Sequence, residues 1–159
     1  NKIKNHPRYP YHLLREEMQE FILDKLQLLI ERKLIKGIGE NGTEYTVIAQ
    51  ILDLPKEILR LIQKFDFTKK NPKLIYINTG ETMISLQDSI LVTFLNLAGF
   101  DILFFVPTGY QSVENYFAEK LMEEHQIGEY KYDMQVPDLN NISTNSTRPS
   151  WRRKLFRRG

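Results

Sequence analysis

Two short apolar runs, each ending at a Thr-Gly dipeptide, constrain the fold of this chain more than any other feature. The first run is KLIYI at 73–77 and the second is DILFFV at 101–106, with a helix-like stretch between them. A strand, a helix and a strand within about 30 residues have the size of a right-handed crossover unit. The second run is continuously apolar, which is typical of a parallel strand covered on both faces. We therefore expect a parallel β-α-β unit over 73–106.

The residues around this unit extend the alternation of strands and helices. Ser85-x-x-Asp88 has the form of a capping box, so we expect a helix that begins there and ends at Gly99. Ser112 can cap a further helical stretch, and 129–136 alternates as a half-buried or edge strand does, with Tyr130, Tyr132, Met134 and Val136 on one side. The predicted fold class is α/β, with a small three-layer Rossmann-like parallel sheet.

An N-terminal helical unit precedes the sheet. Apolar residues recur at helical spacing over 11–35, and shorter helical patterns follow from Thr43 and from Pro55. The predicted division is an arm or linker at 1–10, a three-helix unit at 11–65, a Rossmann-like unit at 71–136, and a polar loop with a basic-aromatic tail at 137–159.

The predicted sheet is too small to stand alone. The helical unit, a partner chain or another part of the polypeptide would have to complete it. The chain begins with Asn1 rather than Met, and we expect it to be part of a longer polypeptide.

The two Thr-Gly loops form the candidate ligand-binding site. In a parallel sheet, strand-to-helix loops lie at the carboxyl edge, where ligands bind. Glycine lets backbone N–H groups approach an anion or a ring, threonine adds a hydroxyl, and the next helix offers unpaired N–H donors. The candidate residues are Asn78, Thr79, Gly80, Glu81, Thr108, Gly109 and Tyr110.

Each of these residues also has a purely structural interpretation. Thr-Gly can turn a chain off a strand without any ligand, and the sequence contains neither a Walker loop nor a dinucleotide fingerprint. Glu81 can hold a ribose, a metal or a proton, or it is a solvated carboxylate near a helix N-terminus. Tyr110 can stack on a ligand or cover the edge of the core. Both interpretations stay open, and turn chemistry is the more economical one.

The composition excludes several kinds of chemistry. The chain has no cysteine, so disulfides, thiolate nucleophiles and cysteine zinc sites are absent. Its three histidines lack ligand spacing, and no nucleophile-base pair is evident, which argues against a self-contained hydrolase. We predict no metal site, identify no cofactor, and leave open whether the chain is an enzyme. No apolar run approaches the ~18 residues that span a bilayer, which favours a cytoplasmic setting.

The C-terminal tail differs in charge from the rest of the chain. Six of the 22 basic residues and no acidic residue lie in 148–159, so residues 1–147 carry 16 basic against 20 acidic residues. Such a tail can bind nucleic acid or an anionic membrane, or it can dock on the acidic body, which is the interpretation we favour. The candidate partner-binding residues are Arg148, Trp151, Arg152, Arg153, Lys154, Arg157 and Arg158.

Three longer stretches resemble one bacterial family. They are NPKLIYINTGETMISLQDSILVTFLNLAGFDILFFVPTGYQSVENYF, HQIGEYKYDMQVPDL and SWRRKLFRRG. Together they resemble the C-terminal part of the YceG-like family of Bacillus and its relatives, described as a component of a "biosynthetic module" found beside tellurium-resistance and stress-response genes. The resemblance implies a bacterial, cytoplasmic, multidomain parent that makes or senses a nucleotide-like metabolite under stress. It carries over no functional residue.

Two classes of function follow from these observations. The first is a ligand-binding or catalytic domain whose phosphorylated or nucleotide-like ligand lies over the two Thr-Gly loops. The second is a non-enzymatic domain that binds proteins of a stress complex, which an exposed apolar stripe on the 11–35 helix would favour. Nucleic-acid binding through the tail is a weaker third alternative, and an oligomer is compatible with all three.

Overall fold

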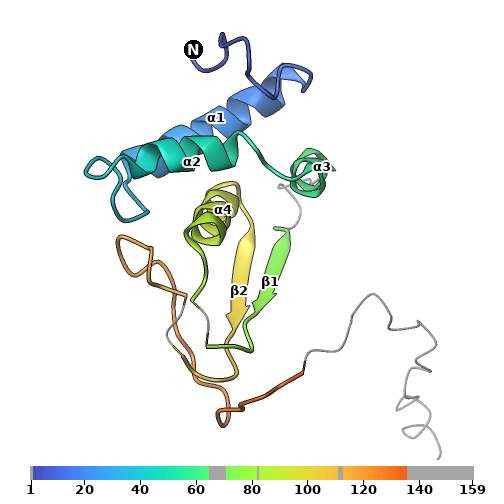
Figure 1. Cartoon of the computed structure of the whole chain (residues 1–159). Helices are drawn as coiled ribbons and strands as arrows, with labels where there is room; N and C mark the ends of the chain where they lie inside the picture. Colours follow the sequence, from blue (N-terminus) through green and yellow to red (C-terminus); the bar gives the residue numbers. More distant parts are fainter. Residues whose placement is uncertain (1, 65–70, 82, 111–112, 136–159) are drawn as a thin grey trace, which may run out of the picture.

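The computed structural model describes residues 2–64, 71–81, 83–110 and 113–135, and the fold there is mixed α/β. Three helices precede a β-α-β unit (Figure 1). The elements in chain order are α1 (Glu16–Glu31), α2 (Thr43–Ile51), α3 (Lys56–Lys64), β1 (Lys73–Ile77), α4 (Leu86–Leu97) and β2 (Asp101–Phe105).

The β-α-β unit lies where the two apolar runs predicted it. β1 and β2 pair in parallel, in a register that runs from Lys73 opposite Asp101 to Ile77 opposite Phe105. The crossover helix α4 packs against α1, α2 and β2, and it therefore occupies the centre of the fold (Figure 1). The strand pair and its crossover are thus confirmed.

The predicted cap of α4 is present in atomic detail. Ser85 Oγ accepts a hydrogen bond from the Asp88 backbone N–H at 3.0 Å and donates one to the Asp88 carboxylate at 2.6 Å. The first pairing satisfies one of the N–H groups that an α-helix leaves free at its start. The helix ends at Leu97 with Ala98 as its C-cap, and Gly99 follows with a φ of +97°, a conformation that glycine adopts without steric cost.

The helices α1, α2 and α4 share one hydrophobic core. The apolar stripe of α1 is buried, and Ile22 and Leu29 have no exposed surface. These side chains belong to the same cluster as Val47 of α2 and Phe94 of α4. The stripe on the first helix is therefore used for internal packing, which removes the observation that would have favoured a partner on that helix.

One tyrosine joins the segment before α1 to the end of α2. Tyr11 is 4% exposed, and its hydroxyl donates to the Ile51 carbonyl at 2.6 Å and accepts from the Leu54 N–H at 2.9 Å. Residues 11–14 form turns that bring this ring into the core, and Lys33 has a positive φ of 50° just after α1. The long helix predicted over 11–35 is for these reasons limited to Glu16–Glu31.

Two predicted elements are wrong within the described residues. No helix forms over 113–121, because its backbone pairs with the chain after α1: the Lys36 N–H donates to the Tyr116 carbonyl, and the Ala118 N–H donates to the Leu34 carbonyl, both at 2.9 Å. No strand forms over 129–135, and Tyr132 is 62% exposed rather than half-buried. In the described part of the chain the parallel sheet has two strands instead of three.

Among the described residues, one face of the sheet is uncovered, which the continuous apolar pattern of the second strand did not predict. Leu74, Tyr76, Ile102 and Phe104 pack toward α4 and the core, and the rings of Tyr76 and Phe104 stack at 5.0 Å. The opposite side chains are between 42% and 57% exposed, and we call them the open face: Ile75, Ile77, Leu103 and Phe105. The prediction that both faces are covered is therefore wrong for the residues that the structure describes.

None of the helices in the described ranges combines the length and the apolar character needed to cross a membrane.

Candidate functional site

The first Thr-Gly loop continues directly from β1 at the carboxyl edge of the sheet. The Asn78 N–H donates to the Phe105 carbonyl at 2.9 Å, which extends the pairing of the strands by one residue. The Asn78 side-chain oxygen then accepts from the Gly80 N–H at 3.2 Å. This is the local turn that asparagine side chains favour, and it directs the chain toward Glu81.

The second loop is held by its own turn and by a segment that follows it. The Gly109 N–H donates to the Val106 carbonyl at 3.0 Å, and the Lys131 N–H donates to the Pro107 carbonyl at 2.8 Å. Gly109 has a φ of +69°, and a Cβ placed there would lie 2.2 Å from a ring carbon of Tyr130. Glycine is therefore needed at this position both for the backbone and for the close approach of that ring.

The two loops meet through a side-chain pair. The Tyr110 hydroxyl donates a hydrogen bond to the Glu81 carboxylate Oε1 at 3.0 Å. This hydrogen bond, together with the negative charge of Glu81, raises the pKa of the Tyr110 phenol above its usual value. The phenol therefore keeps its proton, and can donate to Glu81, up to a higher pH than an ordinary tyrosine.

A buried hydroxyl lies beside this pair in the sequence. Thr108 is 6% exposed, and its Oγ1 has no hydrogen-bond partner among the residues that the structure describes. A buried polar atom without a partner costs about 1–3 kcal/mol, so such atoms call for an explanation. Because this oxygen has almost no accessible surface, a ligand bound on the surface of the loops would not reach it.

The arrangement limits the chemistry that the loops can perform. The N–H groups of Gly80 and Gly109 already donate within their own loops, so they do not form the anion cradle that the sequence suggested. The helix after the first loop, α4, begins at Leu86, and the Ser85 side chain caps its N-terminus. The second loop is not followed by a helix, because none forms over 113–121. The accessible side-chain groups that remain are the Glu81 carboxylate and the Tyr110 phenol, which suit neutral hydroxyl-bearing ligands better than free phosphate.

Two further expectations concern a metal site, which the sequence does not predict, and the basic tail. No cluster of three or more histidine, aspartate or glutamate side chains that could hold a metal is found in the part of the chain described here. The tail residues lie outside the described residues: Arg148, Trp151, Arg152, Arg153, Lys154, Arg157 and Arg158.

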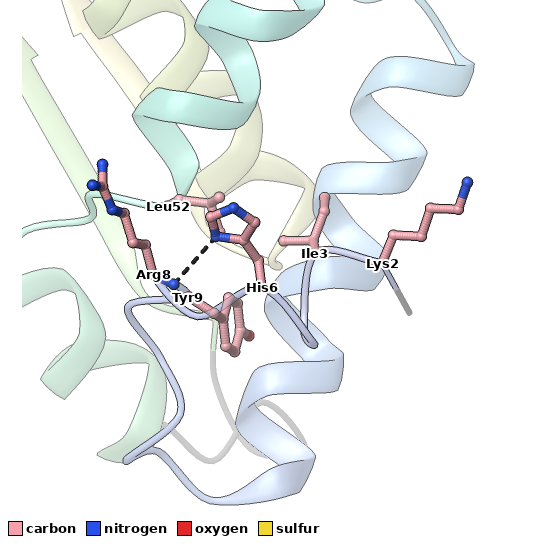
Figure 2. A pocket seen from close by; sticks show the side chains of 6 residues that line it. All are labelled: Lys2, Ile3, His6, Arg8, Tyr9 and Leu52. Atoms are coloured by element: carbon pink, nitrogen blue, oxygen red, sulfur yellow. Dashed lines mark hydrogen bonds between the residues drawn. The ribbon is translucent and has the colours of Figure 1, made fainter.

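A hollow lies away from the loops, and sequence reasoning missed it. It is a cavity of about 250 Å³ between the N-terminal segment and the end of α2 (Figure 2). The His6 Nδ1 accepts the Arg8 N–H there at 3.2 Å. No sequence signal could have located it, because turns rather than a periodic element bring its lining together: Lys2, Ile3, His6, Arg8, Tyr9 and Leu52.

The fold and the loops define a small α/β domain built on one parallel β-α-β unit. Residues 1–147 match the profile of the YceG domain family, and the chain belongs to that family. The chain is also similar to the "Uncharacterized protein YceG" of Bacillus subtilis (strain 168), with 31% identity over 93 residues. That match covers 57% of this chain and 17% of the relative, so the chain corresponds to a minor part of the relative's length. No solved structure matches the chain.

Proposed function

We propose that this YceG-family domain binds a nucleotide-like metabolite at the loop pair, by which we mean Asn78–Glu81 and Thr108–Tyr110. The observation that carries the proposal is the 3.0 Å hydrogen bond between the Tyr110 hydroxyl and the Glu81 carboxylate. It unites two loops from neighbouring parallel strands at the carboxyl edge of the sheet, where ligands of open α/β sheets bind.

Glu81 is the residue that recognises the sugar. A carboxylate accepts several hydrogen bonds, and the Tyr110 hydroxyl contacts one of its two oxygens. The carboxylate therefore keeps acceptor capacity for the vicinal hydroxyls of a ribose, and hydrogen bonds to a charged acceptor are the stronger kind.

Tyr110 and Thr108 complete the proposed site. Tyr110 is 42% exposed, so part of its ring is accessible for stacking on a base. Thr108 is buried, so its role in the proposed site is to hold the second loop in place rather than to contact the ligand. Asn78, Thr79 and Gly80 shape the first loop, and their role is to position Glu81 rather than to carry out chemistry.

The phosphates of such a ligand would extend away from the glycines. The Gly80 and Gly109 N–H groups are occupied within their turns, which leaves recognition to the sugar and the base. Because no nucleophile-base pair accompanies the loops among the residues that the structure describes, we propose binding rather than a self-contained reaction. The site would lie at the carboxyl edge of a three-layer Rossmann-like sheet once the open face is covered.

A thermal-shift screen of the purified chain tests this function. The probes are nucleosides, nucleotides, free bases and inorganic phosphate. Nucleosides and nucleotides are expected to raise the melting temperature, whereas free bases and phosphate leave it unchanged. The Glu81→Gln variant should lose the shift, and Glu57→Gln, on the exposed surface of α3, should keep it. A shift with phosphate alone, or no shift with any sugar-bearing ligand, would reject the proposal.

We also propose a cytoplasmic bacterial setting in which the ligand is made or sensed under stress, including tellurium stress. The support for this setting is membership of the YceG domain family together with the resemblance of the sequence to proteins encoded beside such genes. A strain lacking the complete gene should become sensitive to tellurite, and the Glu81→Gln gene should fail to restore resistance. Equal resistance in the deleted strain would refute the association.

A further inference from the structure

The open face combines large apolar side chains with high exposure. Ile75 lies opposite Leu103 and Ile77 lies opposite Phe105 in the strand register, so the four side chains form one contiguous patch. Their exposed fractions are 57%, 49%, 42% and 46% in the same order. Single exposed apolar residues are common on protein surfaces, but a contiguous patch of this kind marks a contact site.

The sequence of the strands indicates that this patch is normally covered. Strands with one solvated face alternate apolar and polar residues, whereas parallel strands buried on both faces are apolar throughout. Residues 74–77 and 102–105 are apolar or aromatic at every position, and α4 covers only one side of them. The pattern is therefore that of the inner strands of a three-layer sheet, although one layer is missing among the described residues.

Polar groups mark both ends of the patch. The Lys73 ammonium pairs with the Asp101 carboxylate at the beginning of the strands, and this contact lowers the pKa of Asp101. The Glu81 and Tyr110 pair lies at the other end. The outward apolar side chains between these groups span three residues of each strand, 75–77 and 103–105, or roughly 10 Å. A helix of about seven residues, or two turns, has the same length.

The size of the patch decides what kind of occupant fits. Four half-exposed side chains of this type present roughly 400 Å² of apolar surface. Two copies that meet face to face would bury about 800 Å² in total, below the roughly 1,200 Å² of a stable interface between separate molecules. A segment of the same polypeptide does not lose translational freedom when it docks, so a patch of this size is sufficient for it.

The Bacillus subtilis relative contains sequence that can supply such a segment. Since the match covers 17% of that protein, 83% of its length lies outside the match. We propose that in the complete polypeptide the open face is covered by an amphipathic helix from another segment of the same chain, whose aliphatic stripe packs on Ile75, Ile77, Leu103 and Phe105. This helix is the counterpart of α4 and forms the third layer of the sheet.

The absence of cysteine from these 159 residues makes the test direct. Leu103→Cys places a thiol on the open face, and Leu13→Cys is the control at a position that is 88% exposed and distant in the sequence. Each variant is made in the 159-residue chain and in the complete polypeptide that its gene encodes. The rate of reaction with Ellman's reagent is measured for both, after subtraction of the unsubstituted protein.

The proposal predicts that the thiol at position 103 reacts at least ten-fold more slowly in the complete polypeptide, whereas the thiol at position 13 reacts equally fast in both. Equal rates at position 103 would overturn it. If the thiol at position 103 already reacts slowly in the 159-residue chain and the rate depends on protein concentration, the occupant is a second copy instead. If that slow rate does not depend on concentration, the occupant is a segment of these 159 residues. Ile75→Cys serves as a second probe if Leu103→Cys fails to fold.

Discussion

Replacing Tyr11 with phenylalanine removes one hydroxyl that serves two backbone groups. The hydroxyl donates to the Ile51 carbonyl at 2.6 Å and accepts from the Leu54 N–H at 2.9 Å, and both hydrogen bonds are buried. The ring itself would stay in place, because phenylalanine has the same shape. The substitution therefore isolates the contribution of the link between the segment before α1 and the end of α2.

The loss of stability can be worked out from these two contacts. A buried hydrogen bond contributes about 0.5–1.5 kcal/mol net, and a backbone group left without a partner costs about 1–3 kcal/mol. The Tyr11→Phe variant should thus lose about 2–3 kcal/mol in the free energy of unfolding. For a domain of this size that corresponds to a melting temperature lower by roughly 4–12 °C.

The same residue predicts a dependence on alkaline pH. Burial raises the pKa of the Tyr11 phenol from 10.0 to about 12. The folded state holds the proton more tightly than the unfolded state, so this contribution to stability is complete below pH 10 and is lost as the pH rises toward 12. The slope is about 1.4 kcal/mol per pH unit in that window. The variant lacks this contribution, so the difference between the two proteins shrinks above pH 10.

Urea denaturation at pH 7 and at several values between pH 9 and 12 measures both effects. Tyr45→Phe is the matched control, because Tyr45 is 74% exposed, and its stability should equal that of the unsubstituted chain. If Tyr11→Phe lies within 0.5 kcal/mol of the unsubstituted protein at pH 7, the hydroxyl does not join the two segments and the reasoning is wrong.

Three further predictions concern the loops and the cap. Ser85→Ala should lower the free energy of unfolding by about 1 kcal/mol in urea denaturation, because the N-cap of α4 is lost; an unchanged value would contradict the capping role. Gly109→Ala should cost more than about 1 kcal/mol because of its φ of +69° and the nearby Tyr130 ring, and Tyr130→Ala in the same chain should recover part of that loss. Full additivity of the two substitutions would show that the ring does not contact the glycine. Glu81→Gln should lower the pKa of Tyr110 toward the ordinary tyrosine value, which NMR of ring-labelled tyrosine can follow; an unshifted titration would mean that the two side chains do not interact in solution.

Local patterns in the sequence predicted the elements whose determinants are local. The capping sequence from Ser85 to Asp88 fixed the start of α4, and Gly99 fixed its end, since both depend on a few neighbouring residues. The two strands were found because their apolar runs are bounded by turn residues. The two Thr-Gly loops were expected at the carboxyl edge of the sheet because they follow these strands, and the structure places Glu81 beside Tyr110 there.

The failures arose where distant contacts decide the structure. Val113 and Phe117 have helical spacing and are buried, yet Phe117 forms an isolated antiparallel bridge with Ile35, which no local pattern encodes. Tyr130 and Tyr132 alternate as in a strand, but a strand also needs a partner ladder. In the described residues this segment instead crosses the second loop, with the Tyr130 ring against Gly109. Alternation alone therefore says which side chains share a side, not what pairs with them.

The most direct test of the central claim is the affinity of the loop pair for a nucleoside, measured by isothermal titration calorimetry. The ligand is the sugar-bearing compound that gives the largest thermal shift. Hydrogen bonds to a charged acceptor contribute about 1.5–3 kcal/mol, so Glu81→Gln should weaken binding by about 10- to 100-fold, while Glu57→Gln binds as the unsubstituted chain does. Equal affinity of the Glu81→Gln variant and the unsubstituted chain would contradict the claim that this carboxylate recognises the ligand.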